Sequence, residues 1–247
     1  MNFFSLFKRN LFYKFKKKIN IDNNNLKNKS LDELFFYFGS DKANYISKGK
    51  SESHGFSKFY IKHLNQIREK NINILEIGSF EGASAAAFLK YFYNSKIICL
   101  DINISKFIYS SKKIKVFGLD IKNRSEVKKI LSKINNNLDI NFFDIIIDDG
   151  SHNLSDMLLS FKIFFKYLNK GGTFVIEDFK FPNYYKRNKN IDHALFDEVI
   201  KNLNKKIVFK SSILTKEDQL FFHDNIQKIS VYKGNLNNSD ICFIKKF

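Results

Sequence analysis

Two stretches of the sequence decide the fold: IIIDDGSH at residues 145–152 and TFVIEDF at residues 173–179. Each is an apolar run that ends in two carboxylates, as expected of a strand buried on both faces of a parallel sheet. Ligands of open α/β sheets bind beyond the carboxyl ends of such strands. We therefore expect four carboxylates and the imidazole of His152 to meet in one crevice. Such a crevice suits a hard cation with a base beside it.

Strands and helices alternate on both sides of these stretches. Strands are predicted at residues 73–77, 96–100, 115–119, 143–147, 173–176, 226–232 and 241–245. Helices are predicted at residues 59–69, 83–93, 125–134 with a Ser cap, 154–168 ending at a Gly pair, and 191–203. This order predicts an α/β, Rossmann-like doubly wound fold with a mostly parallel seven-stranded sheet. The last two strands are close enough in sequence to form an antiparallel C-terminal hairpin.

The composition divides the chain into three parts. Residues 1–19 are a basic amphipathic segment, residues 20–70 a linker followed by helices and loops, and residues 71–247 the Rossmann-like domain. In the second part, Ser30 and Glu33 form a capping-box pattern that predicts the start of a short helix. The sequence contains no internal repeat and no sign of a second domain.

The formal net charge of +17 suggests nucleic acid or anionic lipid as a partner. The richness in Lys, Asn, Ile and Phe, with one Pro and no Trp, is also typical of an A/T-biased coding sequence. There is no RNA-binding signature and no Cys/His finger spacing, which argues against nucleic acid. Cys99 and Cys242 lie in apolar runs and imply no disulfide framework. A reducing, cytoplasmic location is therefore expected.

The N-terminus, MNFFSLFKRNLFYKFKKK, carries six basic residues and no acid. Its large apolar residues recur at the spacing of a helix, and the pattern predicts a basic amphipathic helix. They are Phe3, Phe4, Phe7, Leu11, Phe12 and Phe15. The segment is too charged for a signal peptide and too short to span a bilayer. Two interpretations stay open: residues 1–18 lie on the anionic inner membrane surface, or they pack on the domain or on a second subunit of a homo-oligomer.

A glycine-containing turn follows the first long strand, from Glu76 through Gly78 to Gly82. Glycine permits a tight turn and a close approach of ligand to backbone. The spacing is Gly-x-x-x-Gly, which differs from the Gly-x-Gly-x-x-Gly of dinucleotide-binding folds. Asp101 ends the second strand, where it could accept both ribose hydroxyls of an adenosine ligand, and Asp120 ends the third, near the adenine. Taken singly, each of these residues is also ordinary turn chemistry.

From about residue 73 to the end, this order resembles the class I S-adenosylmethionine-dependent methyltransferases. The resemblance implies that Glu76, Gly78 and Gly82 form the first cofactor motif and that Asp101 binds ribose. It implies S-adenosylmethionine as cofactor.

The second half supplies oxygen ligands suited to Mg²⁺. Asp149, Glu177 and Asp178 stand at neighbouring strand ends, and His152 follows at the start of the next helix. A cation nearby favours a neutral imidazole, as a general base requires. Asp148 either caps that helix or contacts cofactor.

This arrangement resembles the macrocin and mycinamicin sugar O-methyltransferases, the TylF/MycE-type family. The resemblance implies that Asp149, Glu177 and Asp178 hold Mg²⁺ and that His152 is the base. Catechol O-methyltransferases have a related metal layout, with Lys at the position of His152.

Residues 39–42 and 54–60 also resemble a segment that precedes the domain in this family. Asp41, Lys42 and His54 are therefore expected on the substrate side. The family usually has Tyr two residues after the His, whereas this chain has Phe56, so that hydroxyl is missing.

These features predict a Mg²⁺-assisted O-methyltransferase that acts on a hydroxyl of a sugar or of a glycosylated or cell-surface acceptor. Three alternatives remain at this point: a tRNA or rRNA methyltransferase, an NAD-type oxidoreductase on the same fold, and a binding module without catalysis. The Gly-x-x-x-Gly spacing argues against the oxidoreductase, and the complete set of acids argues against a module without catalysis.

Overall fold

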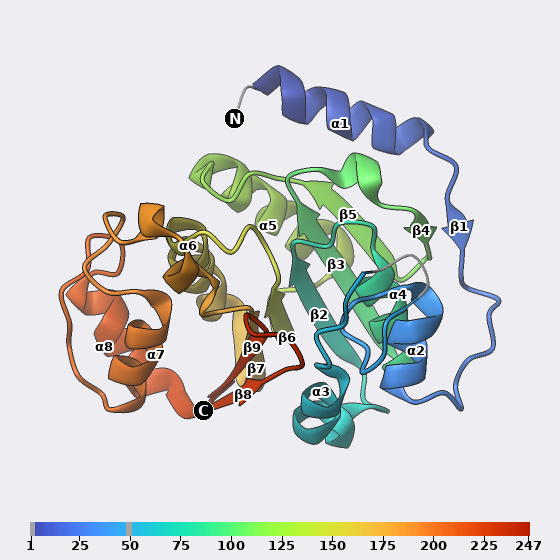
Figure 1. The fold of residues 1–247 in the computed structure, drawn as a ribbon. Helices are drawn as coiled ribbons and strands as arrows, with labels where there is room; N and C mark the ends of the chain where they lie inside the picture. Colours follow the sequence, from blue (N-terminus) through green and yellow to red (C-terminus); the bar gives the residue numbers. More distant parts are fainter. Residues whose placement is uncertain (1–2, 48–50) are drawn as a thin grey trace.

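The computed structural model describes residues 3–47 and 51–247, and its centre is one seven-stranded sheet (Figure 1). The strands are β2 (Ile72–Ile77), β3 (Ser95–Asp101), β5 (Ile114–Gly118), β6 (Phe143–Asp148), β7 (Leu168–Glu177), β8 (Ile226–Lys233) and β9 (Asp240–Lys246). They lie in the order β5-β3-β2-β6-β7-β9-β8, and the first five are parallel. β9 is antiparallel to both β7 and β8. The predicted fold class, with its C-terminal hairpin, is confirmed.

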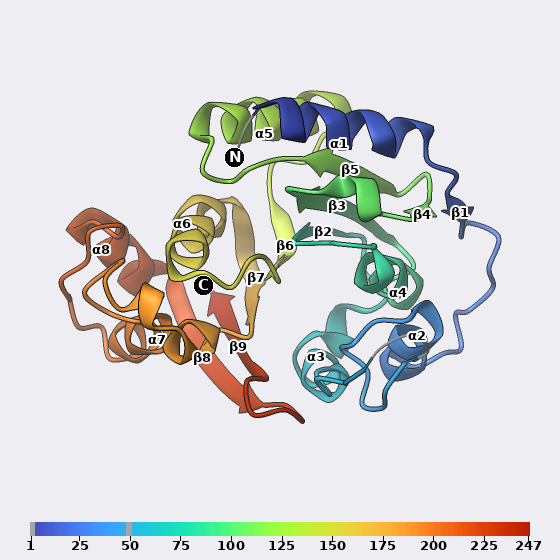
Figure 2. The same cartoon turned by 45° about the horizontal axis from the view of Figure 1, so that its top comes forward.

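Helices cover both faces of the sheet (Figure 2). They are α1 (Phe3–Phe15), α2 (Leu31–Phe38), α3 (Ser57–Leu64), α4 (Ala83–Tyr91), α5 (Arg124–Leu138), α6 (Leu154–Phe164), α7 (Phe196–Asn204) and α8 (Lys216–Asn225). The short pieces are β1 (Ile19–Asn20), paired with β4 (Tyr109–Ser110), and the 3₁₀ turns η1 (Asn65–Ile67), η2 (Ile104–Lys106), η3 (Phe165–Tyr167), η4 (Phe181–Tyr184) and η5 (Lys186–Asn188). Side chains of α5 to α8 form one core with the sheet, and those of α2 to α4 form the other.

The apolar runs follow from this double coverage. Along β6, Ile145 and Ile147 point into the core beneath α2 to α4, while Ile146 points into the core beneath α5 to α8. All three side chains are fully buried. A strand with two buried faces needs apolar residues at successive positions, because its side chains alternate between the faces.

Several predicted boundaries are wrong for local reasons. The helix predicted at 191–203 begins at Phe196, because the Asp192 carboxylate binds backbone amides of His193 and Ser212 and holds a loop there. The helix predicted at 154–168 ends at Phe164, and the Gly pair lies within β7.

The cap predicted at Ser125 is wrong, because Asn123 accepts the amide of Glu126 and the helix begins at Arg124. The capping box of Ser30 and Glu33 is confirmed. A second capping box, Thr215 with Asp218, begins α8, a helix absent from the sequence-based assignment.

The predicted N-terminal helix forms as α1, which lies along the β5 edge of the sheet beside α5 (Figure 2). Within residues 3–47 and 51–247, no helix is long and apolar enough to cross a membrane.

Gly82 and Gly171 provide a matched pair for testing backbone strain. Both have left-handed φ values, +81° and +71°. A Cβ at Gly82 would meet the Phe107 ring at 2.4 Å, whereas a Cβ at Gly171 would meet nothing within 4 Å. We expect Gly171→Ala to lower the free energy of unfolding by about 1–2 kcal/mol, and Gly82→Ala to lower it by clearly more. Denaturant unfolding measures both, and equal losses would contradict the proposed clash with Phe107.

Candidate active site

The acidic strand ends meet at the point where the strand order reverses. β3 and β5 lie on one side of β2, and β6 and β7 lie on the other, so β2 and β6 flank the switch point. Ile77 of β2 pairs with Asp148 of β6, and the Asp149 amide donates to the Ile77 carbonyl at 2.9 Å. A crevice at this position is where ligands of open α/β sheets bind.

A cavity of about 480 Å³ opens there, within the range of about 300–1,000 Å³ typical of small-molecule pockets. Of the residues predicted to bind cofactor, Gly78, Asp101, Asp120 and Asp148 line it. Asp149, a predicted metal ligand, lines it as well. Gly78 has a φ of +86°, and a Cβ there would meet the Asp149 carbonyl oxygen at 1.9 Å. Glycine at this position therefore lets the β2 turn and the β6 turn touch.

Glu76 and Gly82 do not line the cavity. Glu76 is fully buried and accepts a hydrogen bond from the Ser84 hydroxyl at 2.5 Å. Burial raises the pKa of Glu76 to about 7, although Lys42 and Ser84 oppose the shift. Gly82 packs against Phe107. In this structure both residues support the turn from beneath.

The three aspartates predicted to bind cofactor all line the cavity, but their surroundings differ. The Asp101 carboxylate accepts the amides of Phe80 at 2.8 Å and Asn103 at 2.6 Å, which hold it at the cavity wall. Asp120 accepts the Lys122 amide at 3.0 Å.

Asp148 accepts the Gly150 amide at 3.2 Å, and burial raises its pKa to about 6. Of the two alternatives for Asp148, capping of the next helix is wrong, because Asn153 occupies the cap position of α6. Contact with cofactor stays a prediction.

Asp149, His152 and Asp178 form a compact cluster beside the cavity. One ligand atom from each lies within 4.8 Å of the others. His152 Nε2 is 3.7 Å from Asp149 Oδ1 and 4.0 Å from Asp178 Oδ2. His152 and Asp178 have left-handed φ values, +52° and +49°. Such backbone conformations cost about 1–3 kcal/mol each and concentrate at functional sites.

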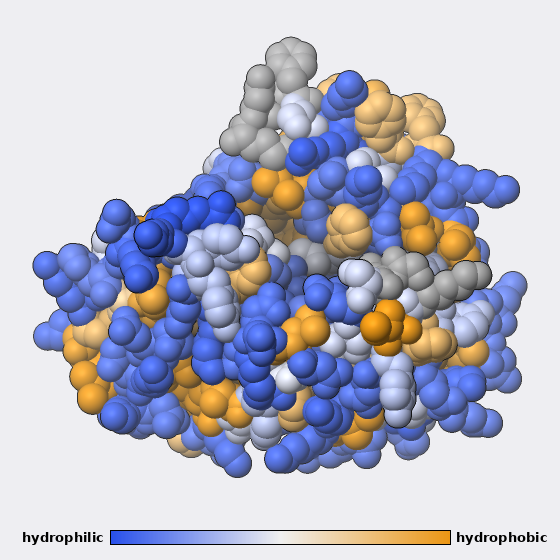
Figure 3. Space-filling view, in the orientation of Figure 1, coloured by the Kyte–Doolittle hydropathy of each residue, from blue (hydrophilic) through white to orange (hydrophobic). Residues whose placement is uncertain are grey.

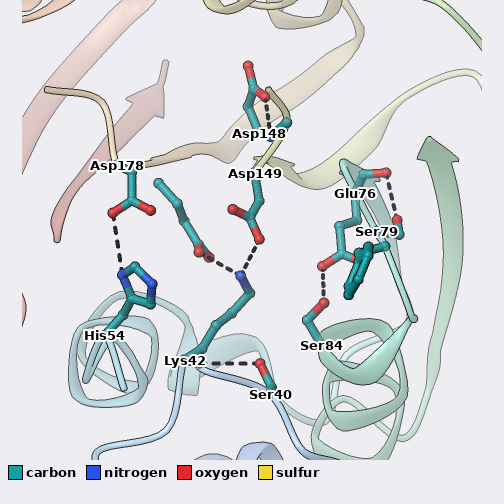
Figure 4. A network of polar contacts seen from close by, with 12 residues as sticks. Ser40, Lys42, His54, Glu76, Ser79, Ser84, Asp148, Asp149 and Asp178 are labelled. Carbon is teal, nitrogen blue, oxygen red and sulfur yellow. Dashed lines mark hydrogen bonds and ion pairs between the residues drawn. The ribbon is translucent and has the colours of Figure 1, made fainter. Parts of the chain in front are cut away.

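Glu177 faces a different partner. Lys42 Nζ lies 2.5 Å from Asp149 Oδ2 (Figure 4). It also lies 2.6 Å from Glu177 Oε2, so one ammonium group bridges two predicted metal ligands. The Tyr60 hydroxyl donates to the other Glu177 oxygen. Burial alone would lower the pKa of Lys42, but Asp149 and Glu177 outweigh it and raise that pKa well above its usual value. Burial raises the pKa of Glu177, and Lys42 opposes this.

The segment before α3 delivers these groups. The amide of His54 donates to the Asp41 carbonyl at 2.7 Å, and the amide of Phe56 donates to the Lys42 carbonyl at 2.9 Å. These bonds hold residues 41–42 and 54–56 side by side, so Lys42 and His54 enter the site together.

His54 connects this segment to the C-terminal hairpin. Its Nδ1 lies 2.7 Å from the Ser239 hydroxyl and 3.5 Å from Asp178 Oδ1. Burial alone would lower the pKa of His54, but the interaction with Asp178 outweighs burial and raises this pKa to about 9. His54 thus lies beside Asp178 Oδ1, whereas His152 lies beside Asp178 Oδ2.

Phe56 is fully buried, and Tyr60, one helical turn later, brings a hydroxyl to Glu177 instead. Sequence reasoning missed Tyr60 and the bridging position of Lys42. No local pattern identifies them, because the fold of residues 41–60, and not their spacing in the sequence, brings them to the acids.

A family model for FtsJ-like methyltransferases matches residues 56–222, more than half of the chain. The chain belongs to this family. The match includes the strand ends, the cavity and the acids, and the expectation of a methyltransferase is confirmed.

Curated relatives of this chain include two O-methyltransferases. L-Olivosyl-oleandolide 3-O-methyltransferase of Streptomyces antibioticus is 30% identical over 162 residues, which cover 63% of this chain and 38% of that protein. Mycinamicin VI 2''-O-methyltransferase of Micromonospora griseorubida is 29% identical over 132 residues, or 51% and 31% of the two chains. The predicted resemblance to macrolide sugar O-methyltransferases is confirmed. The matches span less than half the length of either relative.

A solved structure agrees in fold. MycE methyltransferase from the mycinamycin biosynthetic pathway, in complex with Mg and SAH, superposes with a TM-score of 0.65 at 22% identity. The match covers 88% of this chain and 55% of MycE. At this identity the likeness establishes the fold.

Replacing Lys42 tests the bridge between Asp149 and Glu177. We expect Lys42→Met to lower the free energy of unfolding by about 3–5 kcal/mol in chelator, because it leaves two buried carboxylates without their cation. Mg²⁺ should restore more stability to the variant than to the wild type. Lys180→Met is the control: Lys180 also pairs with an acid, Asp240, but is 40% exposed, so less than about 1 kcal/mol should be lost. Equal effects of the two substitutions would argue against the bridge.

Proposed function

We propose that this chain transfers a methyl group from S-adenosylmethionine to a hydroxyl of a sugar or glycosylated acceptor, assisted by Mg²⁺, with His152 as general base. One observation carries the proposal: Asp149, His152 and Asp178 bring their ligand atoms within 4.8 Å of one another beside the cavity at the switch point. Family membership supports the reaction type, and the printed names of the relatives support a sugar hydroxyl as acceptor.

The cavity suits S-adenosylmethionine. Gly78 lines it with backbone alone, and Met157 and Ile121 add apolar wall. We assign Asp101, which also lines the cavity, to the ribose hydroxyls. We assign Asp120 to the adenine end and Asp148 to the floor near the acids. Glu76 and Gly82 would act indirectly, by holding the turn that carries Gly78.

The acids suit a hard divalent cation because they offer carboxylate oxygens from neighbouring strands. Asp149 and Asp178 already face a common point with His152. We propose Glu177 as the third oxygen ligand, which requires its carboxylate to be shared with or released from Lys42. Lys42 thus holds the acids together when the cation is absent.

Each group of the site has a separate role in the proposed reaction. When bound, Mg²⁺ supplies Lewis acidity that lowers the pKa of an acceptor hydroxyl. His152 would take the proton of that hydroxyl at Nε2, the atom that faces the acids. S-Adenosylmethionine would give its sulfonium methyl group to the deprotonated acceptor oxygen and leave as S-adenosylhomocysteine, while the protein mainly aligns donor and acceptor for in-line transfer. His54 and the hairpin turn at Ser239 would form the acceptor side.

His152→Gln tests the base. We expect kcat to fall about 100- to 10,000-fold, with S-adenosylmethionine binding unchanged by calorimetry, because His152 lies outside the cavity lining. His193→Gln, at an exposed histidine, is the matched control and should keep full activity. Turnover on a panel of sugar nucleotides, glycolipids and glycosylated macrolides provides the assay. Undiminished turnover by His152→Gln would remove this residue from the mechanism.

Asp178→Asn tests the cation site independently of turnover. We expect the affinity for Mg²⁺, measured by calorimetry, to fall at least about tenfold because a carboxylate ligand is lost. Asp139→Asn is the control: Asp139 is exposed at the end of α5 with a φ of +54°, where Asn is well tolerated. Full activity of the wild type in excess chelator would exclude the metal while leaving the methyltransferase assignment intact.

The net charge of +17 favours one second candidate, a nucleic-acid methyltransferase. Such an enzyme should bind tRNA or rRNA fragments with an affinity that falls steeply as salt rises. Methylation of RNA in preference to every sugar acceptor would establish this candidate in place of the sugar hydroxyl.

A further inference from the structure

Helix α1 contacts the domain through one of its faces. Leu6 is buried, the Arg9 guanidinium donates to the Ile102 carbonyl at 3.1 Å, and the Tyr13 ring meets the Phe107 ring edge-on. Asn10 lies so close to Gly118 that a Cβ atom added to Gly118 would clash with the Asn10 side chain. One turn later, Lys16 Nζ donates to the Ser105 carbonyl at 3.0 Å. The spacing of these positions places them along one side of the helix.

The other side of α1 presents large apolar side chains to solvent. Phe7 is 59% exposed and Phe15 is 82% exposed, and Leu11 and Phe12 are exposed as well. In Figure 3, pale orange apolar side chains gather at the top of the molecule, where α1 lies, with blue side chains beside them. We call Phe7, Leu11, Phe12 and Phe15 the outer stripe. The helix therefore packs on the domain and still leaves these four apolar side chains uncovered.

Basic side chains surround the outer stripe. Lys8, Lys14 and Lys17 are exposed, and Lys8 Nζ lies 5.7 Å from the centre of the Phe12 ring. Residues 1–18 contain no acid. Aromatic and aliphatic side chains flanked by lysines on a short helix are the composition of a segment that lies in the interface of an anionic bilayer.

We propose that the outer stripe of α1 docks the enzyme on an anionic membrane surface. Charge selects this occupant over a second copy of the chain. A two-fold contact between two α1 helices would bring identical basic surfaces together, and each chain already carries a net charge of +17. Anionic lipid head groups would instead neutralise the lysines while the rings enter the acyl boundary.

This docking would orient the enzyme as well as retain it. The Ile102 carbonyl that accepts from Arg9 belongs to a residue lining the cavity, so the cavity rim and α1 are held together. An enzyme bound through the outer stripe would therefore keep that rim at a fixed distance from the lipid surface.

The absence of Trp from the chain permits a direct test. Phe15→Trp places a single indole in the outer stripe, and Phe142→Trp places one at an exposed phenylalanine elsewhere. With vesicles of phosphatidylcholine and phosphatidylglycerol, we expect a blue shift of the emission for Phe15→Trp and none for Phe142→Trp. Pure phosphatidylcholine vesicles should give little binding. An unshifted emission from Phe15→Trp at saturating anionic lipid would overturn the proposal.

A matched pair of double variants tests the energetics. Phe7→Ser with Phe15→Ser should reduce vesicle partitioning by about tenfold or more, since two large side chains leave the interface. Phe36→Ser with Phe142→Ser makes the same chemical change at sites that are 49% and 48% exposed, and should leave partitioning unchanged. Thermal unfolding checks that both proteins fold. Equal partitioning of both variants, or a concentration-dependent dimer that the first variant abolishes, would contradict membrane docking.

Discussion

Lys42 places one ammonium group between Asp149 and Glu177, and the geometry of the site depends on this contact. The two acids leave adjacent parallel strands at the same edge of the sheet, where their charges repel at short range. The lysine is 2% exposed, so water screens little of either the repulsion or the attraction. A buried pair of this kind contributes little net stability compared with apolar packing, but the loss of one partner is expensive. Its effect is to set the relative positions of the acids and of the segment that carries Lys42.

The same contact couples three distant parts of the chain. Residues 41–42 pair with residues 54–56, and Asn235 of the hairpin turn donates its amide to the His54 carbonyl at 2.9 Å. Tyr60 adds a hydroxyl to Glu177 from α3. The acids are thus enclosed by the first segment of the domain and by its last hairpin, while β6 and β7 supply the base of the site. Left-handed backbone at His152 and Asp178 is maintained because these surroundings constrain both turns.

The sequence could predict features whose cause is local. The capping box of Ser30 and Glu33, the apolar strands and the carboxylates at strand ends each depend on a few consecutive residues. The sequence could not predict where the folded chain places each residue of a motif. Gly82 and Glu76 belong to the same short motif as Gly78, yet Gly78 alone of the three lines the cavity. Likewise the helix predicted at 191–203 begins only at Phe196, because Asp192 accepts hydrogen bonds from Ser212, twenty positions away. Helical spacing does not contain such a contact.

Helix α1 shows the same limit in its amphipathic pattern. Apolar spacing correctly predicts that a helix forms, and the largest apolar side chains would ordinarily mark its buried face. Here the domain instead contacts the side of the helix with Leu6, Asn10 and Tyr13. Gly118 and Phe107 provide a close-fitting surface for that side. In addition, backbone carbonyls of the domain accept hydrogen bonds from Arg9 and Lys16. Hydrogen bonds and shape fix the orientation of the helix, so its apolar side remains available. A helix with two different faces can bind the domain and a lipid surface at once, and neither contact has to be broken to form the other.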